Sequence, residues 1–146
     1  MTTVEKAVEI KIISTIHQID QEKQTYELWL QGSFHKKSNK MYLRYEEFME
    51  EKKVKTTLKM GNKQALILRG GDLNMRLPFH ISQTEHGHYD TKYGFLPLQT
   101  KTNRLEFHHF EDNHIKGTFH VEYDLFISGQ PVGKYKLEIQ YTEGQA

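Results

Sequence analysis

Apolar and polar residues alternate along most of this chain, and the alternation is clearest toward its C-terminal end. In residues 119–127 every second side chain is apolar, and the same period returns in residues 135–141. Successive side chains of a β-strand point to opposite faces, so a period of two predicts strands with one buried face. The chain as a whole predicts roughly ten strands, of which the clearest span residues 8–16, 26–34, 41–45, 54–60, 64–69, 75–81, 105–107, 119–127 and 135–141.

The connections between these segments are too short for a parallel sheet. Parallel strands require crossovers of about a dozen residues or more, whereas the turns here lie at residues 20–23, 36–39, 61–62, 70–72, 111–113 and 128–131. We therefore predict an all-β, antiparallel, up-and-down arrangement of roughly 8–10 strands, closed into a barrel because closure removes both sheet edges. A β-sandwich is the alternative.

Three local features add detail to this prediction. Residues 46–53 are rich in Glu, and we interpret them as a strand end and a charged hairpin loop, with a short helical turn as the alternative. The run from Ala65 to Leu68 is apolar at every position, which indicates a strand buried on both faces. Pro78 lacks a backbone N–H, so we expect its strand to lie at an edge or to carry a bulge.

Composition and charge narrow the functional classes. The length of 146 residues predicts one domain, spanning residues 1–146, and the absence of cysteine excludes disulfides, thiolate metal sites and cysteine nucleophiles. Twenty Lys and Arg residues nearly balance nineteen Asp and Glu residues, so we expect neither nucleic acid nor a membrane as partner. The first ten residues lack a signal-peptide core, which favours a cytoplasmic protein. Both a monomer and a homodimer remain open.

Nine histidines raise the question of a metal site. His86 and His88 would share one face of a strand, a spacing that can bind a metal, with a third ligand from His108, His109 or His114. No carboxylate stands at a recognisable ligand spacing, and no serine lies in a nucleophile motif. The sequence therefore predicts no metal and no cofactor, and it favours a non-catalytic protein.

The arginines form the most informative pattern, because only four of the twenty basic residues are arginine. Arg69 and Arg76 flank the turn at residues 70–72, and Arg44 precedes Tyr45 on another strand. Arginine beside tyrosine at the mouth of a barrel suits an anionic or carboxylate ligand. The alternative is an internal ion pair with Glu46 or Glu47 that plugs the barrel end. The candidate ligand-binding residues are Arg44, Arg69, Arg76, Tyr45, Glu46 and Tyr123.

Six segments together resemble the YwiB-like proteins of Gram-positive bacteria, namely MYLRYEE (41–47), VKTTLK (54–59), LRGG (68–71), NMRLPF (74–79), YDTKYG (89–94) and VEYDL (121–125). They cover nearly the whole chain in the right order. The resemblance implies a calycin-type, lipocalin-like β-barrel in a small cytoplasmic protein of unknown function. It brings no catalytic residue, and it places in the family's recurrent motifs Tyr45, Glu46, Arg69, Arg76, Tyr93 and Gly94.

Three functions are open on the sequence alone. The first is non-catalytic binding of a small anionic or amphipathic ligand in or at the mouth of the barrel. The second is a protein-interaction module whose barrel is filled by its own side chains, as barrels of about eight strands can be. The third is a metal-dependent enzyme that uses His86 and His88.

Overall fold

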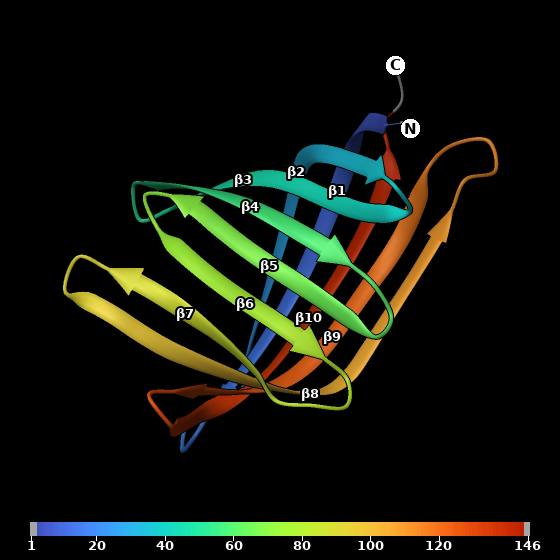
Figure 1. Ribbon diagram of the computed structural model, residues 1–146. Helices are drawn as coiled ribbons and strands as arrows, with labels where there is room; N and C mark the ends of the chain where they lie inside the picture. Colours follow the sequence, from blue (N-terminus) through green and yellow to red (C-terminus); the bar gives the residue numbers. More distant parts are fainter. Residues whose placement is uncertain (1–2, 145–146) are drawn as a thin grey trace.

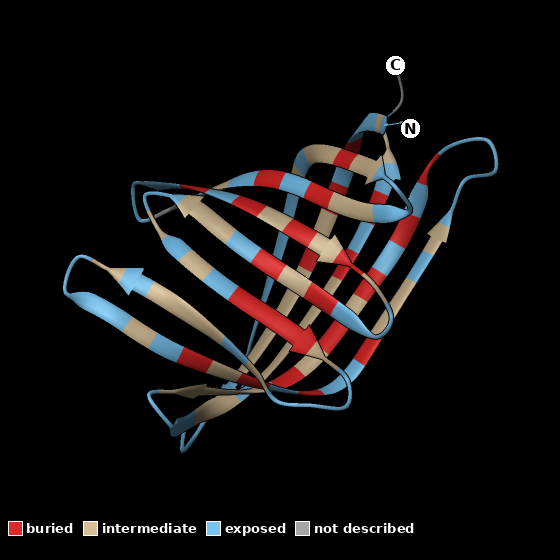
Figure 2. Cartoon of the chain, in the orientation of Figure 1, coloured by how far each residue is buried: buried red, intermediate tan, exposed pale blue. Residues whose placement is uncertain are grey.

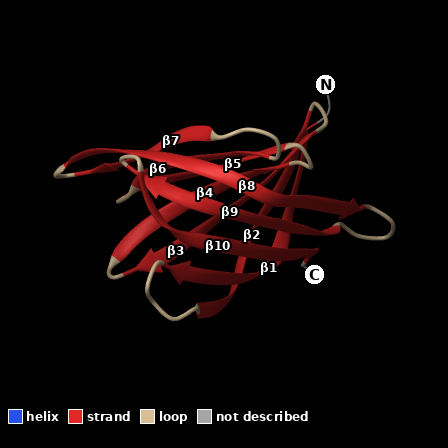
Figure 3. Cartoon of the chain, turned by 90° about the horizontal axis from the view of Figure 1, so that it is seen from below, coloured by secondary structure: helices blue, strands red, loops and turns tan. Residues whose placement is uncertain are grey.

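The computed structural model describes residues 3–144, and within them it contains strands, turns and loops but no helix (Figure 3). This part of the chain therefore has no helix that is long and apolar enough to cross a membrane. Its strands are β1 (Thr3–Gln18), β2 (Gln24–Lys37), β3 (Lys40–Met49), β4 (Lys52–Met60), β5 (Gln64–Gly71), β6 (Asn74–His80), β7 (Glu85–Thr91), β8 (Gly94–Phe110), β9 (Lys116–Ile127) and β10 (Gln130–Glu143).

Each strand pairs antiparallel with its neighbours in sequence, and β1 also pairs with β10, which closes the sheet into a barrel (Figure 1). The closing ladder is long, because residues 8–18 of β1 lie opposite residues 143–133 of β10. This arrangement confirms the predicted all-β, up-and-down barrel, and the alternative of a β-sandwich is wrong. The turns that follow odd-numbered strands lie at one end, here called the hairpin end, and the chain termini lie at the other.

The Glu-rich stretch at 46–53 is a tight β-hairpin, so the alternative of a helical turn is wrong. Only Glu50 and Glu51 connect β3 to β4. Both residues have positive φ, 50° and 68°, which is the geometry of the type I′ turn favoured in two-residue hairpins. Nζ of Lys53 on β4 lies 3.4 Å from a carboxylate oxygen of Glu46 on β3, so the two side chains form an ion pair across the hairpin.

The apolar strand β5 is buried on one face only, so the prediction of burial on both faces is wrong. Ile67 points into the barrel and is 3% exposed, whereas Leu68 points outward and is 40% exposed. Within residues 3–144 no second layer covers the outside of the sheet. Strand β6 pairs with β5 on one side and with β7 on the other, and no bulge interrupts either ladder, so the predicted edge or bulge is wrong. Pro78 is accommodated because the β6–β7 ladder covers only residues 74–76 of β6, so that no ladder bond is needed from residue 78 on that side.

The interior of the barrel divides into a filled half near the termini, where the largest fully buried side chains lie, and an open half at the hairpin end, which contains a cavity. Large aromatic residues occupy the filled half, where Phe34, Phe79, Phe119 and Tyr141 are each exposed by 1% or less. The ring of Phe34 stacks on that of Tyr141, with centroids 5.6 Å apart, and on that of His109 at 4.9 Å. Near the hairpin end the inward residues of β1, β9 and β10 are only partly buried (Figure 2).

A chain of hydrogen bonds runs from the filled half to the surface. The hydroxyl of Tyr141 lies 2.7 Å from Nδ1 of His109, and Nε2 of His109 lies 2.8 Å from Glu111. Glu111 also accepts a bond from Lys36 at 3.3 Å. Burial raises the pKa of Tyr141, so its phenol stays protonated beside the imidazole of His109. Gly117 permits this close packing, because a Cβ there would collide with the hydroxyl of Tyr141.

We expect Gly117→Ala to lower the free energy of unfolding by about 1–3 kcal/mol, the usual cost of extra volume in a filled core. Urea denaturation followed by circular dichroism measures the change. Adding Tyr141→Phe should not restore the stability of the parent, because the ring carbon Cζ at position 141 and the backbone carbonyl of His108 would still meet the new methyl group.

Gly70→Ala is the matched control for this prediction. It also adds a methyl group to a strand glycine, but the nearest atom lies 4.0 Å from the new Cβ and no positive φ opposes it. The change in stability should stay within about 0.5 kcal/mol. A Gly117→Ala protein as stable as the parent would contradict this account of the filled half.

Candidate functional site

The open half of the barrel contains a cavity of about 310 Å³. Residues near the hairpin ends of seven strands line it, and its apolar wall includes Met75, Leu77, Leu125 and Ile127. Its two charged residues are Arg69 and Lys136, and Lys136 pairs with Glu138 at 3.3 Å. An apolar cavity with a few converging polar groups is typical of sites that bind small molecules.

Arg69 enters the cavity because Ala65, Ile67 and Arg69 occupy alternate, inward positions of β5. Its Nε is buried and has no hydrogen-bond partner among residues 3–144. In the same part of the chain no carboxylate lies within 4.0 Å of its guanidinium, so the ion pair predicted as an alternative, with Glu46 or Glu47, does not form. The cavity therefore contains a positive charge and a donor that no neighbouring side chain satisfies.

Two buried tyrosines lie close enough to Arg69 to feel its charge. Tyr45 is 6% exposed and Tyr123 is 8% exposed. Burial raises the pKa of both hydroxyls, Glu47 adds to the rise at Tyr45, and the positive charge of Arg69 opposes the rise at each. Both phenols therefore stay protonated and can donate hydrogen bonds. The ring of Tyr123 stacks on that of Tyr135 with centroids 5.4 Å apart, which fixes its position in the wall.

Two buried threonines belong to this region, and sequence reasoning missed both. Thr56 is 1% exposed and lies opposite Arg69 in the β4–β5 register, and Thr102 is 6% exposed and lies opposite Tyr123. Neither hydroxyl has a hydrogen-bond partner within residues 3–144. The sequence does indicate that Thr56 is buried, because it stands on the inward face of β4 between two apolar residues.

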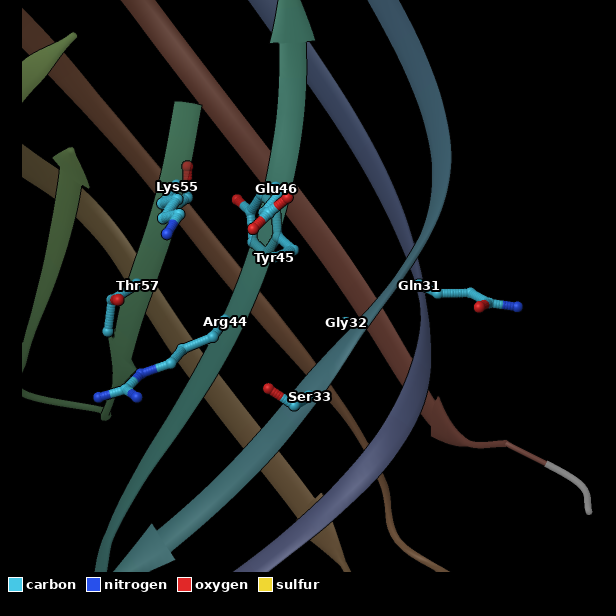
Figure 4. A pocket seen from close by; sticks show the side chains of 9 residues that line it. Gln31, Gly32, Ser33, Arg44, Tyr45, Glu46, Lys55 and Thr57 are labelled. Atoms are coloured by element: carbon cyan, nitrogen blue, oxygen red, sulfur yellow. The ribbon is translucent and has the colours of Figure 1, made fainter. Parts of the chain in front are cut away.

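Three of the six predicted residues lie on the outer face of the barrel. Arg44 and Glu46 flank the inward Tyr45 on β3, beside a surface pocket of about 500 Å³ (Figure 4). In this view the Arg44 side chain extends toward β4, on the side of Thr57. Arg76 lies on the outer face of β6. The structure thus brings Arg69, Tyr45 and Tyr123 together inside the barrel and leaves Arg44, Glu46 and Arg76 outside.

The histidines considered as metal ligands are not gathered in one place. His86 and His88 lie on the outer face of β7, where the ring of His88 stacks on Phe95 with centroids 5.3 Å apart. His109 lies inside the filled half, hydrogen bonded to Tyr141. Among residues 3–144 no group of three or more His, Asp or Glu side chains is arranged to hold a metal ion.

Comparison with known proteins agrees with the barrel. The chain is 26% identical to the uncharacterized beta-barrel protein YwiB of Bacillus subtilis (strain 168) over 132 residues, which are 90% of this chain and 91% of that protein. The crystal structure of the ywiB protein from Bacillus subtilis matches with a TM-score of 0.84 and 26% identity, over 97% of this chain and 94% of that one. Residues 10–139 match the family model described as a domain of unknown function (DUF1934), and this chain belongs to that family.

Proposed function

We propose that this barrel binds a small anionic or amphipathic molecule in the cavity of its open half, without catalysis and in the cytoplasm. The observation that supports this most directly is the buried Nε of Arg69, which has no partner among the described residues and lies at an apolar cavity. A buried donor without a partner costs about 1–3 kcal/mol. A ligand oxygen that accepts this hydrogen bond would remove the cost. A calycin-type barrel, which the sequence resemblance implies, suits a ligand held in its interior.

The charges around the cavity favour a ligand with one negative charge. Arg69 supplies one positive charge without an ion-pair partner among the described residues, whereas the other charged residue of the lining, Lys136, pairs with Glu138. The protonated phenols of Tyr123, in the same wall, and of Tyr45, near Arg69, are hydrogen-bond donors that add no charge. A carboxylate matches this set, because a guanidinium can bind its two oxygens side by side. A second negative charge would be left unpaired in apolar surroundings, close to Glu47, and its desolvation would be costly.

The cavity volume limits the size of the ligand. Water occupies about 30 Å³ per molecule in the liquid, so a cavity of about 310 Å³ corresponds to roughly ten water molecules. A compact acid with on the order of ten non-hydrogen atoms would fit. Its carboxylate would lie at Arg69, and its apolar part would contact Met75, Leu125 and Ile127.

The second hypothesis, a self-filled interaction module, has support from one half of the barrel only. Phe34 and Tyr141 are almost fully buried in the half near the termini, where their rings stack. The cavity beside Arg69 is not filled in this way. Ligand binding is therefore the function that we favour.

We expect Arg69→Met to weaken the binding of a compact aryl acid, 4-phenylbutanoate, by about 10- to 100-fold. A hydrogen bond to a charged group is worth about 1.5–3 kcal/mol, which corresponds to this range of affinity. Isothermal titration calorimetry at neutral pH measures the affinity. The neutral 4-phenylbutanamide should bind the parent and Arg69→Met equally weakly, because it lacks the charge that Arg69 recognises.

Arg104→Met is the matched control, since Arg104 lies on the outer surface and pairs with Glu106 at 3.0 Å and Glu122 at 3.4 Å. We expect this variant to bind the acid as the parent does. If Arg44→Met or Arg76→Met weakened binding and Arg69→Met did not, the ligand would lie on the outer face and the proposal would be wrong. Native mass spectrometry of untagged protein offers an independent measurement, because a bound ligand appears as mass that is lost on denaturation.

We expect Thr56→Val to raise the free energy of unfolding by up to about 1 kcal/mol in the absence of ligand. The substitution keeps the shape of the side chain and removes a buried hydroxyl that has no partner among the described residues. Thr100→Val is the matched control, because Thr100 is equally buried but donates to the carbonyl of Pro78.

The control should lose about 1–3 kcal/mol, since the carbonyl of Pro78 would remain buried without its donor. Urea denaturation of both variants beside the parent measures the two changes. Equal destabilisation by the two substitutions would show that the hydroxyl of Thr56 is satisfied in solution, and it would weaken the case for an unfilled polar site.

A further inference from the structure

One side of β2 is an unpaired sheet edge over half of its length. The strand spans Gln24–Lys37, but its ladder with β3 covers only residues 32–37. Figure 1 shows the two strands diverging beyond this ladder. Residues 24–31 pair with β1 on one side, and no strand of the described chain pairs with their other side. Their backbone N–H and C=O groups on that side are available to another strand.

This free edge lacks the usual protection against pairing. Natural sheet edges are shielded by lysine, proline or bulges, but the segment QTYELWLQ at 24–31 contains neither residue, and no bulge interrupts its register with β1. Its apolar side chains are exposed, by 53% at Tyr26, 41% at Leu28 and 67% at Trp29. Glu27 is its one charged residue. An unshielded edge of this kind is suited to strand addition.

We propose that this edge pairs with the same edge of a second copy of the chain, which makes the protein a two-fold symmetric dimer. An antiparallel edge is complementary to itself in backbone hydrogen bonds, because a two-fold axis perpendicular to the sheet superposes one strand on the other. Such a contact uses the same surface on both copies and closes without further growth. This inference does not depend on the ligand proposed for the cavity.

The charge of Glu27 selects the register of the dimer. Residues directly opposite each other in an antiparallel pair point to the same face of the sheet. A two-fold axis perpendicular to the sheet therefore pairs one residue of the strand with the identical residue of the second copy, and the axis passes between these two residues. An axis at Glu27 would set two carboxylates directly opposite each other, which is destabilising. An axis at Leu28 places Leu28 opposite itself, Tyr26 opposite Leu30, and Glu27 opposite Trp29. Axes farther along the segment pair fewer residues.

The side chains at this register are compatible with each other. Within one chain, Nε1 of Trp29 donates to Glu27 at 3.1 Å, and Lys11 lies 3.6 Å from the same carboxylate. In the dimer the carboxylate of each copy would lie across from the indole of the other, so an acceptor faces a donor on both sides of the axis. The exposed side chain of Leu28 would be covered by its counterpart.

Because the chain contains no cysteine, single cysteine substitutions can report this register directly. Leu28→Cys is expected to form a covalent dimer on mild oxidation, since residues opposite each other in an antiparallel pair are about 4.5–5.5 Å apart at Cα, within the range of a disulfide. Tyr26→Cys and Leu30→Cys should not form one, because each cysteine would lie about 13 Å along the strand from its own counterpart. Electrophoresis without reducing agent separates the products.

Sedimentation velocity over the micromolar range tests the association without a cross-link. The parent is expected to dimerise, and Leu28→Lys should be monomeric, because it places two like charges on the axis. Tyr93→Lys is the matched control, since Tyr93 is 88% exposed and lies in the turn between β7 and β8, neither of which pairs with β2. It should dimerise as the parent does, and circular dichroism confirms that both variants fold.

Three results would overturn the proposal. A parent that stays monomeric over the whole range would do so, and would leave the edge of β2 to a strand from a different protein. A dimer that survives Leu28→Lys would place the contact elsewhere on the surface. Cross-linking of Tyr93→Cys as readily as Leu28→Cys would show random collision and not a defined register.

Discussion

All inward side chains of a closed barrel share one interior, and the number of strands sets the size of that interior. Barrels of about eight strands enclose a space that side chains just fill, whereas this chain closes ten strands. The additional space is not spread evenly. Phe34, Phe119 and Tyr141 fill the half near the termini, and the unfilled volume of about 310 Å³ lies in the half near the hairpin end. The place of the candidate site thus follows from the strand count and from where the large aromatic residues stand.

The two halves also differ in how their polar groups are satisfied. In the filled half, His109 lies within hydrogen-bond distance of both Tyr141 and Glu111. In the open half, the hydroxyl of Thr56 and the Nε of Arg69 are buried without partners among the described residues. Loose packing alone would explain empty volume, but it does not explain why a buried guanidinium donor without a partner among the described residues borders that volume. Buried polar groups are satisfied in most proteins, so this arrangement favours a site for a guest molecule.

Residue alternation was sufficient to predict most of the fold, because one face of each strand is buried and the other is in solvent. The same alternation indicates which arginines point out of the barrel. Arg44 and Arg76 stand on the polar side of strands whose other side is clearly apolar, which places them outside. Arg69 follows a run that is apolar at every position, so its own strand gives no indication of its face. The pairing of Arg69 with Met75 across the turn resolves this, and that register is visible only in the folded chain.

The divergence of β2 from β3 could not be predicted from local pattern, and it links the two proposals. The last paired position sets Gly32 opposite Tyr45, where a Cβ would lie 2.5 Å from the carbonyl of Arg44. Glycine therefore allows the two backbones to approach closely here, beside a large inward side chain. Beyond this point the strands separate, which leaves the edge of β2 without a partner in the described chain. On that edge Tyr26 lies opposite Ser14 of β1, a residue of the cavity wall, so the surface proposed to join two copies adjoins the wall of the cavity.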